Sequence, residues 1–272
     1  MLKLNALHSE KVWGYENWIA SVHPALSHEE FVSECGKDYP LLVKVIQANE
    51  YLSVQVHPDD EAAVKLEGVG NRGKTECWYV LDAEPDAKLV FGLKNDSGKK
   101  YERTELESAI EKKSFEDYLN YVNVKKGDFV FIPAGTVHAI GGGLRLLEVQ
   151  QSCDLTYRLY DWGRPREIHV QKGLSVIKED NLLPIAQFDK EFECQYFSLE
   201  KIKVSGGYSM LCSHEKQDSR DWQLLFVISG EGTVKNADGA FFGLKAEDLI
   251  AVKPGEKITV EGRLELMKIK CR

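Results

Sequence analysis

Most of the chain alternates short apolar segments with turn residues, a pattern typical of proteins built from β-strands. The segments are rich in β-branched and aromatic residues and are bounded by Gly, Pro, Asp or Asn. Because turn signals recur about every 8–12 residues, the pattern favours a sandwich or jelly roll over alternating strands and helices. The predicted strands cover residues 40–47, 51–57, 76–83, 87–93, 128–134, 144–151, 155–162, 196–204, 207–214, 222–229, 248–254 and 264–270.

Helical periodicity is clear in only one long stretch, residues 102–121, where apolar residues recur at helical spacing among Glu and Lys. Two shorter helices are expected over 27–34 and 59–66, where Ser27 and Asp59 can cap the first turn. The sequence therefore predicts an all-β chain with one short helical insertion.

An internal repeat divides the chain in two. Residues 124–149 align without a gap with residues 244–269, and apolar positions match throughout. The strand predicted at 76–83 resembles residues 223–230, whereas the helical stretch lies in residues that only the first copy carries. We therefore predict two jelly-roll domains, residues 1–175 with the insertion at about 102–121, and residues 176–272.

The two copies differ at residues that can bind a metal ion. His138 of the first copy aligns with Ile258 of the second, and Glu76 aligns with Gln223. If the first copy holds a metal site, the second has lost it. The alternative is that His138 is a structural histidine of the core.

Composition narrows the classes of partner. The 272 residues carry a formal net charge of -8 without a block of Lys and Arg, so nucleic acids and anionic membranes are poor partners. No apolar run approaches the ~20 residues that cross a bilayer, and the N-terminus lacks the apolar region of a signal peptide. None of the six cysteines forms a CxxC pair, so we expect free thiols in a reducing cytoplasm.

Candidate chemistry lies in three short motifs. They supply Ser53, Gln55 and His57 on one face of a predicted strand, then Lys74 and Glu76, and finally His138. Taken singly, each has an ordinary alternative: a solvent-facing strand, a surface ion pair, a structural histidine. Together, two imidazoles, a carboxylate and an amide oxygen form a ligand set that suits zinc, and also manganese, iron or cobalt. Because no thiolate takes part, the set leaves a position open to water or substrate.

Six ordered motifs cover residues 13–23, 40–46, 53–60, 73–81, 131–140 and 146–164. Together they resemble the cupin superfamily, and within it the type I mannose-6-phosphate isomerases of the short bacterial form. The resemblance covers most of residues 1–165, and the second half matches only as a generic, degenerate cupin-like set of strands.

The resemblance implies an aldose–ketose isomerase that interconverts mannose 6-phosphate and fructose 6-phosphate through an enediol. A sugar phosphate is then the expected partner, and the protein is expected to be a monomer or a homodimer. The family's ligands for one zinc ion carry over to Gln55, His57, Glu76 and His138, its active-site arginine to Arg158, and its pocket residues to Lys44, Ser53, Lys74, Glu148 and Asp154. The chain departs from the family in its short length and in Gly73, where some members carry a histidine proposed for ring opening.

The reaction suggests a role for each of these residues. A proton moves between C2 and C1, so the site needs a base, an electrophile for the enediolate and an anchor for the phosphate. Arg158 stays charged and can align or stabilise oxygens, while Lys74 could hold an oxygen or shuttle a proton if burial lowers its pKa. Glu148 is the candidate base, or alternatively a partner that orients a metal ligand. Lys44 and Ser53 are candidates for the phosphate anchor, and Asp154 contacts substrate or pairs with Arg158.

Two other classes of function stay open at this point. One is a different metal-dependent cupin enzyme, such as an isomerase of unphosphorylated sugar or a dioxygenase. The other is a non-catalytic cupin that binds sugars as a sensor.

Overall fold

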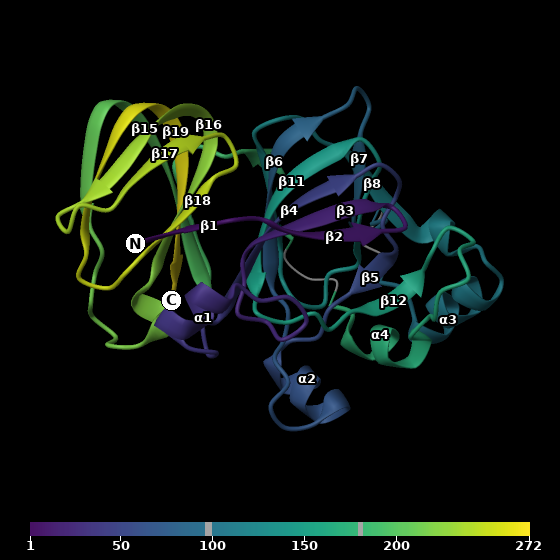
Figure 1. The fold of residues 1–272 in the computed structure, drawn as a ribbon. Helices are drawn as coiled ribbons and strands as arrows, with labels where there is room; N and C mark the ends of the chain where they lie inside the picture. Colours follow the sequence, from purple (N-terminus) through teal and green to yellow (C-terminus); the bar gives the residue numbers. More distant parts are fainter. Residues whose placement is uncertain (96–99, 179–181) are drawn as a thin grey trace. The chain divides into compact units, whose positions relative to one another are not determined.

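The structure, a computed structural model, describes residues 1–95, 100–178 and 182–272, and its contacts form two compact units (Figure 1). Unit 1 comprises residues 1–9, 17–45 and 188–272, and unit 2 comprises residues 10–16 and 46–187. Strands dominate both units, which confirms the predicted all-β architecture.

Most strands of unit 1 form one sheet with the order β1-β18-β16-β19-β15-β14, to which β17 adds by pairing with β16. Its long strands curve around a core of aliphatic side chains from β15, β16, β18 and β19 (Figure 1). Its elements are β1 (Leu2–Leu4), α1 (Glu29–Cys35), β14 (Glu191–Glu193), β15 (Phe197–Leu211), the 3-10 helix η2 (Ser219–Asp221), β16 (Gln223–Asn236), β17 (Phe241–Lys245), β18 (Leu249–Val252) and β19 (Lys257–Cys271).

A row of glycines lets the long strands bend. Gly206 on β15 stands opposite Gly262 on β19, and Gly262 stands opposite Gly232 on β16. A Cβ atom on Gly262 would lie 2.6 Å from the Cα of Gly232, so only glycine permits this close approach. The strands predicted at 196–204 and 207–214 therefore form one strand, because Gly206 between them makes a bend in the sheet and not a turn.

Unit 2 contains two sheets and most of the helices. The smaller sheet has the order β12-β5-β10-β7-β8, and the larger has the order β13-β9-β6-β11-β4-β3-β2. Three strands, β2 (Leu7–Lys11), β3 (Gly14–Ala20) and β4 (Leu41–Ala48), have residues in both units. The elements wholly in unit 2 are β5 (Val54–Val56), α2 (Asp60–Glu67), β6 (Glu76–Ala83), β7 (Lys88–Leu93), α3 (Arg103–Glu111), the 3-10 helix η1 (Phe115–Tyr118), β8 (Leu119–Asn123), β9 (Asp128–Ile132), β10 (His138–Ile140), β11 (Leu144–Gln151), β12 (Tyr157–Tyr160), α4 (Val170–Val176) and β13 (Ala186–Gln187).

The smaller sheet of unit 2 is covered on both faces. One face packs on the larger sheet through a core that includes Trp78 and Ile140. The other face packs on α3 and α4 through Val54, Val56 and Ala139. Side chains that alternate with these last three residues therefore point between the two sheets.

The predicted repeat has a counterpart in the strand order. In unit 2, strands β9, β6 and β11 lie side by side in this order within one sheet. In unit 1, the corresponding strands β18, β16 and β19 lie side by side in the same order. Each copy also uses the same turn, in which the Asp128 or Asp248 carboxylate accepts a 2.8 Å hydrogen bond from the backbone N–H of the lysine three residues before it. The second copy runs through β19 without interruption, whereas glycines 141–143 separate β10 from β11 in the first.

The helices differ from the sequence expectation in detail. The stretch 102–121 is helical only as far as η1, since β8 already begins at Leu119. Asp59 caps α2 as predicted, accepting a 2.8 Å bond from the N–H of Ala62. The cap predicted at Ser27 is wrong, because His28 occupies the N-cap of α1 and its imidazole bonds to the backbone of Asn5 and Ser21. The short apolar segments of β1–β3 and the helix α4 were too weakly periodic to be predicted.

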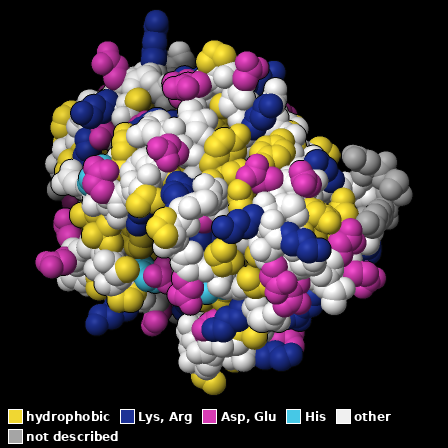
Figure 2. Space-filling view, turned by 90° about the vertical axis from the view of Figure 1, so that its right-hand side faces the viewer, with side chains coloured by type: hydrophobic (Ala, Val, Ile, Leu, Met, Phe, Trp, Pro, Cys, Tyr) yellow, Lys and Arg dark blue, Asp and Glu magenta, His cyan; other side chains and the backbone are white. Residues whose placement is uncertain are grey.

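The surface and thiols add three facts. On the face in Figure 2, acidic and basic side chains are interspersed, so the charge there is mixed. All six cysteines lie in the described part of the chain and are free thiols. None of the helices described is both long and apolar enough to span a membrane.

Candidate metal centre

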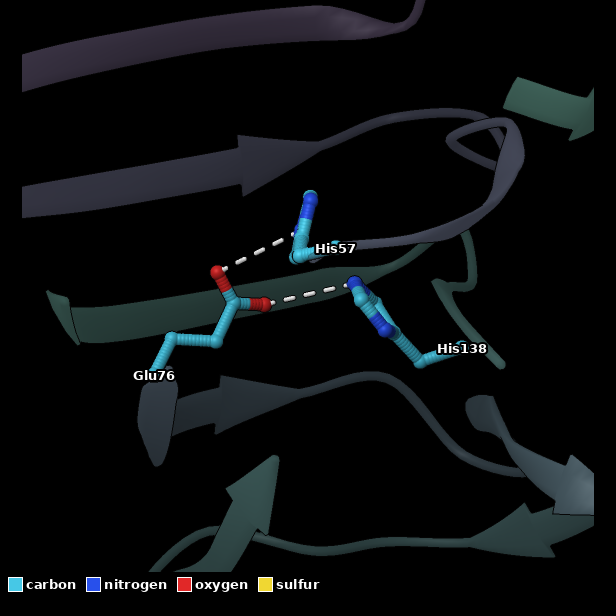
Figure 3. A group of neighbouring side chains, drawn as sticks. All are labelled: His57, Glu76 and His138. Carbon is cyan, nitrogen blue, oxygen red and sulfur yellow. Dashed lines mark ion pairs between the residues drawn. The ribbon is translucent and has the colours of Figure 1, made fainter. Parts of the chain in front are cut away.

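Two histidines and a glutamate from distant parts of the sequence meet in unit 2 (Figure 3). The Nε2 atom of His57 lies 3.7 Å from Oε2 of Glu76, and Nε2 of His138 lies 3.3 Å from Oε1 of the same carboxylate. All three side chains are at most 1% exposed. Because the candidate ligand atoms lie within 4.8 Å of one another, a single ion can contact all three.

Strand register brings these side chains together. Gln55 on β5 stands directly opposite His138 on β10 and Arg158 on β12. Residues paired in this way project from the same face of a sheet, here the face toward the larger sheet. Glu76 is the first residue of β6 in that larger sheet, so the cluster lies between the two sheets where β6 begins.

Each histidine is held with one ring nitrogen toward the cluster. The Nδ1 atom of His57 lies 3.0 Å from the carbonyl oxygen of Leu155, and Nδ1 of His138 lies 2.9 Å from that of Thr136. A carbonyl can only accept, so each Nδ1 carries the proton and each Nε2 presents a lone pair. Burial lowers the pKa of His138 to about 3, against a smaller opposing effect of its bond to Thr136. His138 is therefore neutral at neutral pH, which is the form that binds a metal.

The spacing of the ligand atoms fits a small divalent cation. With bonds of about 2.1 Å, tetrahedral ligands lie about 3.4 Å apart. Each imidazole lies near this distance from one oxygen of Glu76, His138 at 3.3 Å from Oε1 and His57 at 3.7 Å from Oε2. The backbone carbonyls behind both rings are the partners that metal-bound histidines usually have. The residues present therefore fit a nitrogen- and oxygen-ligated metal.

Gln55 supplies the fourth predicted ligand from the edge of the cluster. Its Nε2 atom lies 3.3 Å from Nε2 of His138. The two orientations of an amide differ only in the exchange of its nitrogen and oxygen. Rotation of this amide by half a turn places Oε1 toward His138 Nε2, where the carbonyl oxygen can join the ligand set.

Lys74 lies beside the ligands. Its Nζ atom is 2.8 Å from Oε2 of Glu76 and 3.1 Å from Nε2 of His57. Burial alone would lower the pKa of this lysine, but the negative charges of Glu76 and Glu148 raise it above its usual value. The condition that burial lowers this pKa is therefore not met, so Lys74 is a charged donor to oxygens and not a ready proton acceptor.

The backbone before Lys74 is tightly packed. The N–H of Gly73 donates a 2.8 Å bond to the Asp60 carboxylate, and a Cβ atom on Gly73 would lie 2.5 Å from the backbone N of Asp60. A histidine at this position would collide with the first turn of α2. The departure from the family at Gly73 is thus built into the local packing of this chain.

Glu148 is buried opposite an aromatic residue. It pairs with Trp78 across β11 and β6, and its Oε2 atom accepts a 3.0 Å bond from the indole N–H. The charge of Glu148 also acts on Lys74 and His138, so the carboxylate lies close to the cluster. Trp78 itself makes an edge-on contact with His138, with ring centroids 5.4 Å apart.

The remaining predicted residues lie in different surroundings. Arg158 shares the sheet face of Gln55 and His138, and its Nη1 atom donates a 2.7 Å bond to the Glu167 carbonyl. Ser53 is buried immediately before β5. Asp154 is exposed in the loop between β11 and β12. Lys44 belongs to unit 1, where its ammonium lies 5.1 Å from the ring centroid of Trp18.

Sequence reasoning missed the residues that brace the site. Gln151 and Thr75 are joined by two hydrogen bonds. The Oε1 atom of Gln151 accepts from the backbone N–H of Thr75, and the backbone N–H of Gln151 donates to the Thr75 carbonyl. Its Nε2 atom donates to the Asp60 carboxylate, which ties β11 to the start of α2. Amides and carboxylates that serve as braces look like ordinary surface residues in a sequence. The indole donor of Trp78 gives no separate signal either, because a tryptophan in a strand pattern is typical of a core.

The comparisons with known proteins come from sequence and from structure. The family model of the type I phosphomannose isomerase catalytic domain matches residues 1–109. Mannose-6-phosphate isomerase ManA of Bacillus subtilis (strain 168) is 36% identical over 246 residues, which cover 85% of this chain and 74% of that protein. The mannose-6-phosphate isomerase of Streptococcus mutans is 34% identical over 254 residues, covering 88% and 76%.

Solved structures agree with this fold. The crystal structure of the mannose 6-phosphate isomerase from Bacillus subtilis superposes with a TM-score of 0.80 and 28% identity, covering 98% of each chain. A putative mannosephosphate isomerase from Archaeoglobus fulgidus gives a TM-score of 0.79 at 21% identity, which shows the same fold.

Proposed function

Because the chain belongs to the type I mannose-6-phosphate isomerase family, we propose that it interconverts mannose 6-phosphate and fructose 6-phosphate with the help of a bound divalent metal. The observation that carries this proposal is the buried cluster of His57, Glu76 and His138, with Lys74 beside it. A non-catalytic cupin that only binds sugars would need no more than the metal ligands. A charged donor next to them and an arginine on the same sheet face suit a reaction that develops negative charge on oxygen.

We propose zinc as the metal, held by His57, Glu76, His138 and the amide oxygen of Gln55. When bound, such an ion acts as a Lewis acid that polarises oxygens of the sugar. The neutral imidazoles and the single carboxylate leave coordination positions for these oxygens. The free thiols support a reducing compartment, and we propose the cytoplasm.

The chain's own residues would handle the oxygens and the proton. Arg158 cannot release its proton under physiological conditions, so it would align O1 and O2 and offset the charge of the enediolate. Lys74 would donate hydrogen bonds to the same oxygens, since its pKa is raised. Glu148 is the proposed base between C2 and C1, and Trp78 fixes one of its oxygens. Lys44, Ser53 and Asp154 are the proposed contacts to the rest of the sugar phosphate.

The test is a coupled assay of mannose 6-phosphate conversion to fructose 6-phosphate. The protein is first treated with chelator and then assayed with and without added Zn²⁺, with Mn²⁺ and Co²⁺ in parallel. We expect turnover to disappear on chelation and zinc to restore most of it. Metal binding without turnover of mannose 6-phosphate would refute the substrate and leave the metal site standing.

Three variants locate the activity. His57→Ala and His138→Ala should lose both metal and turnover, whereas Arg158→Ala should bind metal as the wild type does. Its kcat should fall about 10²- to 10³-fold, the usual effect of removing one donor to a developing oxyanion. Normal turnover by a variant without both histidines would overturn the assignment.

A further inference from the structure

The segment after β12 folds around Arg158. Asp161 starts a tight turn in which the N–H of Arg164 donates a 2.9 Å bond to the Asp161 carbonyl. Trp162 and Gly163, the two central residues, have φ values of 55° and 81°. Left-handed backbone at both positions occurs in type I′ turns, but it is strained for a residue as bulky as tryptophan.

Several contacts hold this strained turn in place. The indole N–H of Trp162 donates a 2.6 Å bond to the Leu52 carbonyl. Its ring lies against Tyr51 and Tyr160, with centroids 4.7 and 5.2 Å apart. Strained conformations persist only where the surroundings fix them, and they cluster at functional sites.

A buried carboxylate closes the turn. Asp161 is 2% exposed, and its side chain binds two arginines. Arg164 donates to Oδ1 from Nε and Nη2 at 3.1 and 2.8 Å, while Arg166 donates from Nε to Oδ2 at 2.5 Å and from Nη2 to Oδ1 at 2.6 Å. Arg164 also donates to the Tyr51 carbonyl. One carboxylate therefore fixes the path of the chain from 161 to 166.

The next residues, 167–169, form hydrogen bonds with Arg158. The Glu167 carbonyl accepts the 2.7 Å bond from Nη1 of Arg158. The backbone N–H of Arg158 donates to Nδ1 of His169, and the backbone N–H of His169 donates to the Arg158 carbonyl. The Nε atom of Arg158 is buried and has no partner among the residues that the structure describes, which leaves a donor for a substrate oxygen.

The positive charges of Arg158, Arg164 and Arg166 lie close together and require a negative counterion. Arg164 and Arg166 lie near enough to Arg158 to lower its pKa, after the larger effect of burial, while Asp161 and Glu167 raise it. Glu167 has a side chain that is 83% exposed, so water screens it. Asp161 is therefore the buried negative charge that binds the guanidinium groups of Arg164 and Arg166 and offsets the positive charge of Arg158.

We infer that Asp161 is a positioning residue that acts through Arg158, holding the 161–169 segment so that this guanidinium keeps its orientation toward the substrate. The inference rests on the proposed function, since it assumes that Arg158 contacts the sugar. Loss of the Asp161 charge should release Arg164 and Arg166 and shift the Glu167 carbonyl away from Nη1. The metal ligands lie on or next to other strands and should keep their ion.

The experiment compares Asp161→Asn in the metal-loaded full chain with a matched control, Asp221→Asn. Asp221 is the last residue of η2 in unit 1, is 4% exposed and accepts hydrogen bonds from the backbone N–H groups of Lys216 and Gln217. We expect Asp161→Asn to lower kcat for mannose 6-phosphate about 10- to 100-fold at unchanged metal content, as a displaced catalytic group does. The control should lose stability and keep kcat.

A double variant separates positioning from structural support. If Asp161 acts through Arg158, the variant with both Asp161→Asn and Arg158→Ala should turn over as slowly as Arg158→Ala alone. Additive losses, or an equal loss of kcat in the Asp221→Asn control, would overturn the inference.

A third measurement does not depend on turnover. The Nε–H signal of Arg158 in ¹⁵N-labelled protein, identified by its absence in Arg158→Lys, should be protected from exchange in the wild type and lose this protection in Asp161→Asn. A wild type without isomerase activity that shows this loss refutes the proposed function and supports the positioning. An unchanged signal in Asp161→Asn refutes the positioning whatever the activity.

Discussion

The carboxylate of Glu148 is excluded from water, and its Oε2 atom is bound by the indole N–H of Trp78. Glu148→Gln keeps an oxygen for that bond, so it removes the negative charge with little change in packing. If Glu148 is the base, kcat should fall about 10²- to 10⁴-fold, because that is the usual contribution of a positioned base. Steady-state kinetics and metal analysis of the purified variant measure this.

Glu67→Gln is the control for this substitution. Glu67 binds Tyr157 and Lys172 in the same unit and takes no proposed part in the chemistry. Its variant should keep kcat. If Glu148→Gln stays within a few-fold of the wild type, the carboxylate orients its neighbours and another group removes the proton.

At this scale, the sequence predicted residues whose chemistry is unusual in a core. His57, Glu76 and His138 stand out because polar groups that alternate with apolar ones must either face solvent or meet each other. Asp161 and Gln151 did not stand out, because their roles depend on partners that only the folded chain brings near. The alternation of polar and apolar residues in a strand predicts which face a side chain occupies. It does not predict which backbone carbonyl that side chain will contact in the folded chain.

Gly73 lies between α2 and β6, where its backbone packs against the start of α2 just before the strand that carries Glu76. A methyl group there would press on the backbone of Asp59 and Asp60, which cannot yield as a flexible side chain does. We expect Gly73→Ala to lower the free energy of unfolding by about 1–3 kcal/mol. It should also lower kcat by displacing Lys74. Urea unfolding and kinetics test both effects. Gly207→Ala is the control, because no atom lies within 4 Å of its new methyl group and its φ is not left-handed. An unfolding free energy equal to that of the wild type would contradict the close packing, and an equal kcat would contradict the displacement of Lys74.

A second prediction concerns the start of α1. The ring of His28 accepts a bond from the Ser21 N–H at Nδ1 and lies 2.8 Å from the Asn5 carbonyl at Nε2. Burial lowers its pKa below the usual 6.5, although both backbone contacts oppose the shift. The unfolded chain therefore binds a proton more readily than the folded chain, and stability should fall as the pH drops below about 6.5.

Urea unfolding at about pH 7.5 and pH 5.5 measures this effect. The wild type should lose up to about 1.4 kcal/mol more than His28→Gln between these values, since one pH unit corresponds to that free energy. An equal loss in both proteins would show that His28 titrates alike in the folded and unfolded states.

Strands and helices were predicted well where the periodic pattern of apolar residues extends over enough residues to be recognised. The strand over 144–151 has the predicted bounds, and α2 starts one residue after its predicted cap. The stretch 102–121 was read as one helix because Tyr118 and Leu119 continue the apolar spacing of Leu106 and Ile110, but Leu119 is the first residue of β8. The helix ends where Lys113 takes a left-handed φ of 58°, a local conformation that periodicity cannot reveal.

For the whole molecule, the internal repeat indicates two similar β-units and proposes a boundary between residues 175 and 176. A repeat shows where similar strands recur, but it does not show which copy an N-terminal segment joins. Here β1 pairs with β18 of unit 1, from Leu2 opposite Ala251 to Leu4 opposite Leu249. A strand of three residues has too little pattern to predict such a long-range pairing.

The location of the ligands in one unit leads to a prediction about metal removal. His57, Glu76, His138 and Gln55 all belong to unit 2, so a metal that binds only the folded site stabilises that unit directly. At a free metal concentration of 100 times Kd, this stabilisation is about 2.7 kcal/mol. Hydrogen exchange with and without chelator should therefore show faster exchange in β5, β6 and β10 after chelation, and little change in β18 and β19. In His138→Ala, chelator should change neither set of strands. Equal acceleration in both units of the wild type would mean that they unfold as one cooperative block, because the binding energy would then reach strands that hold no ligand.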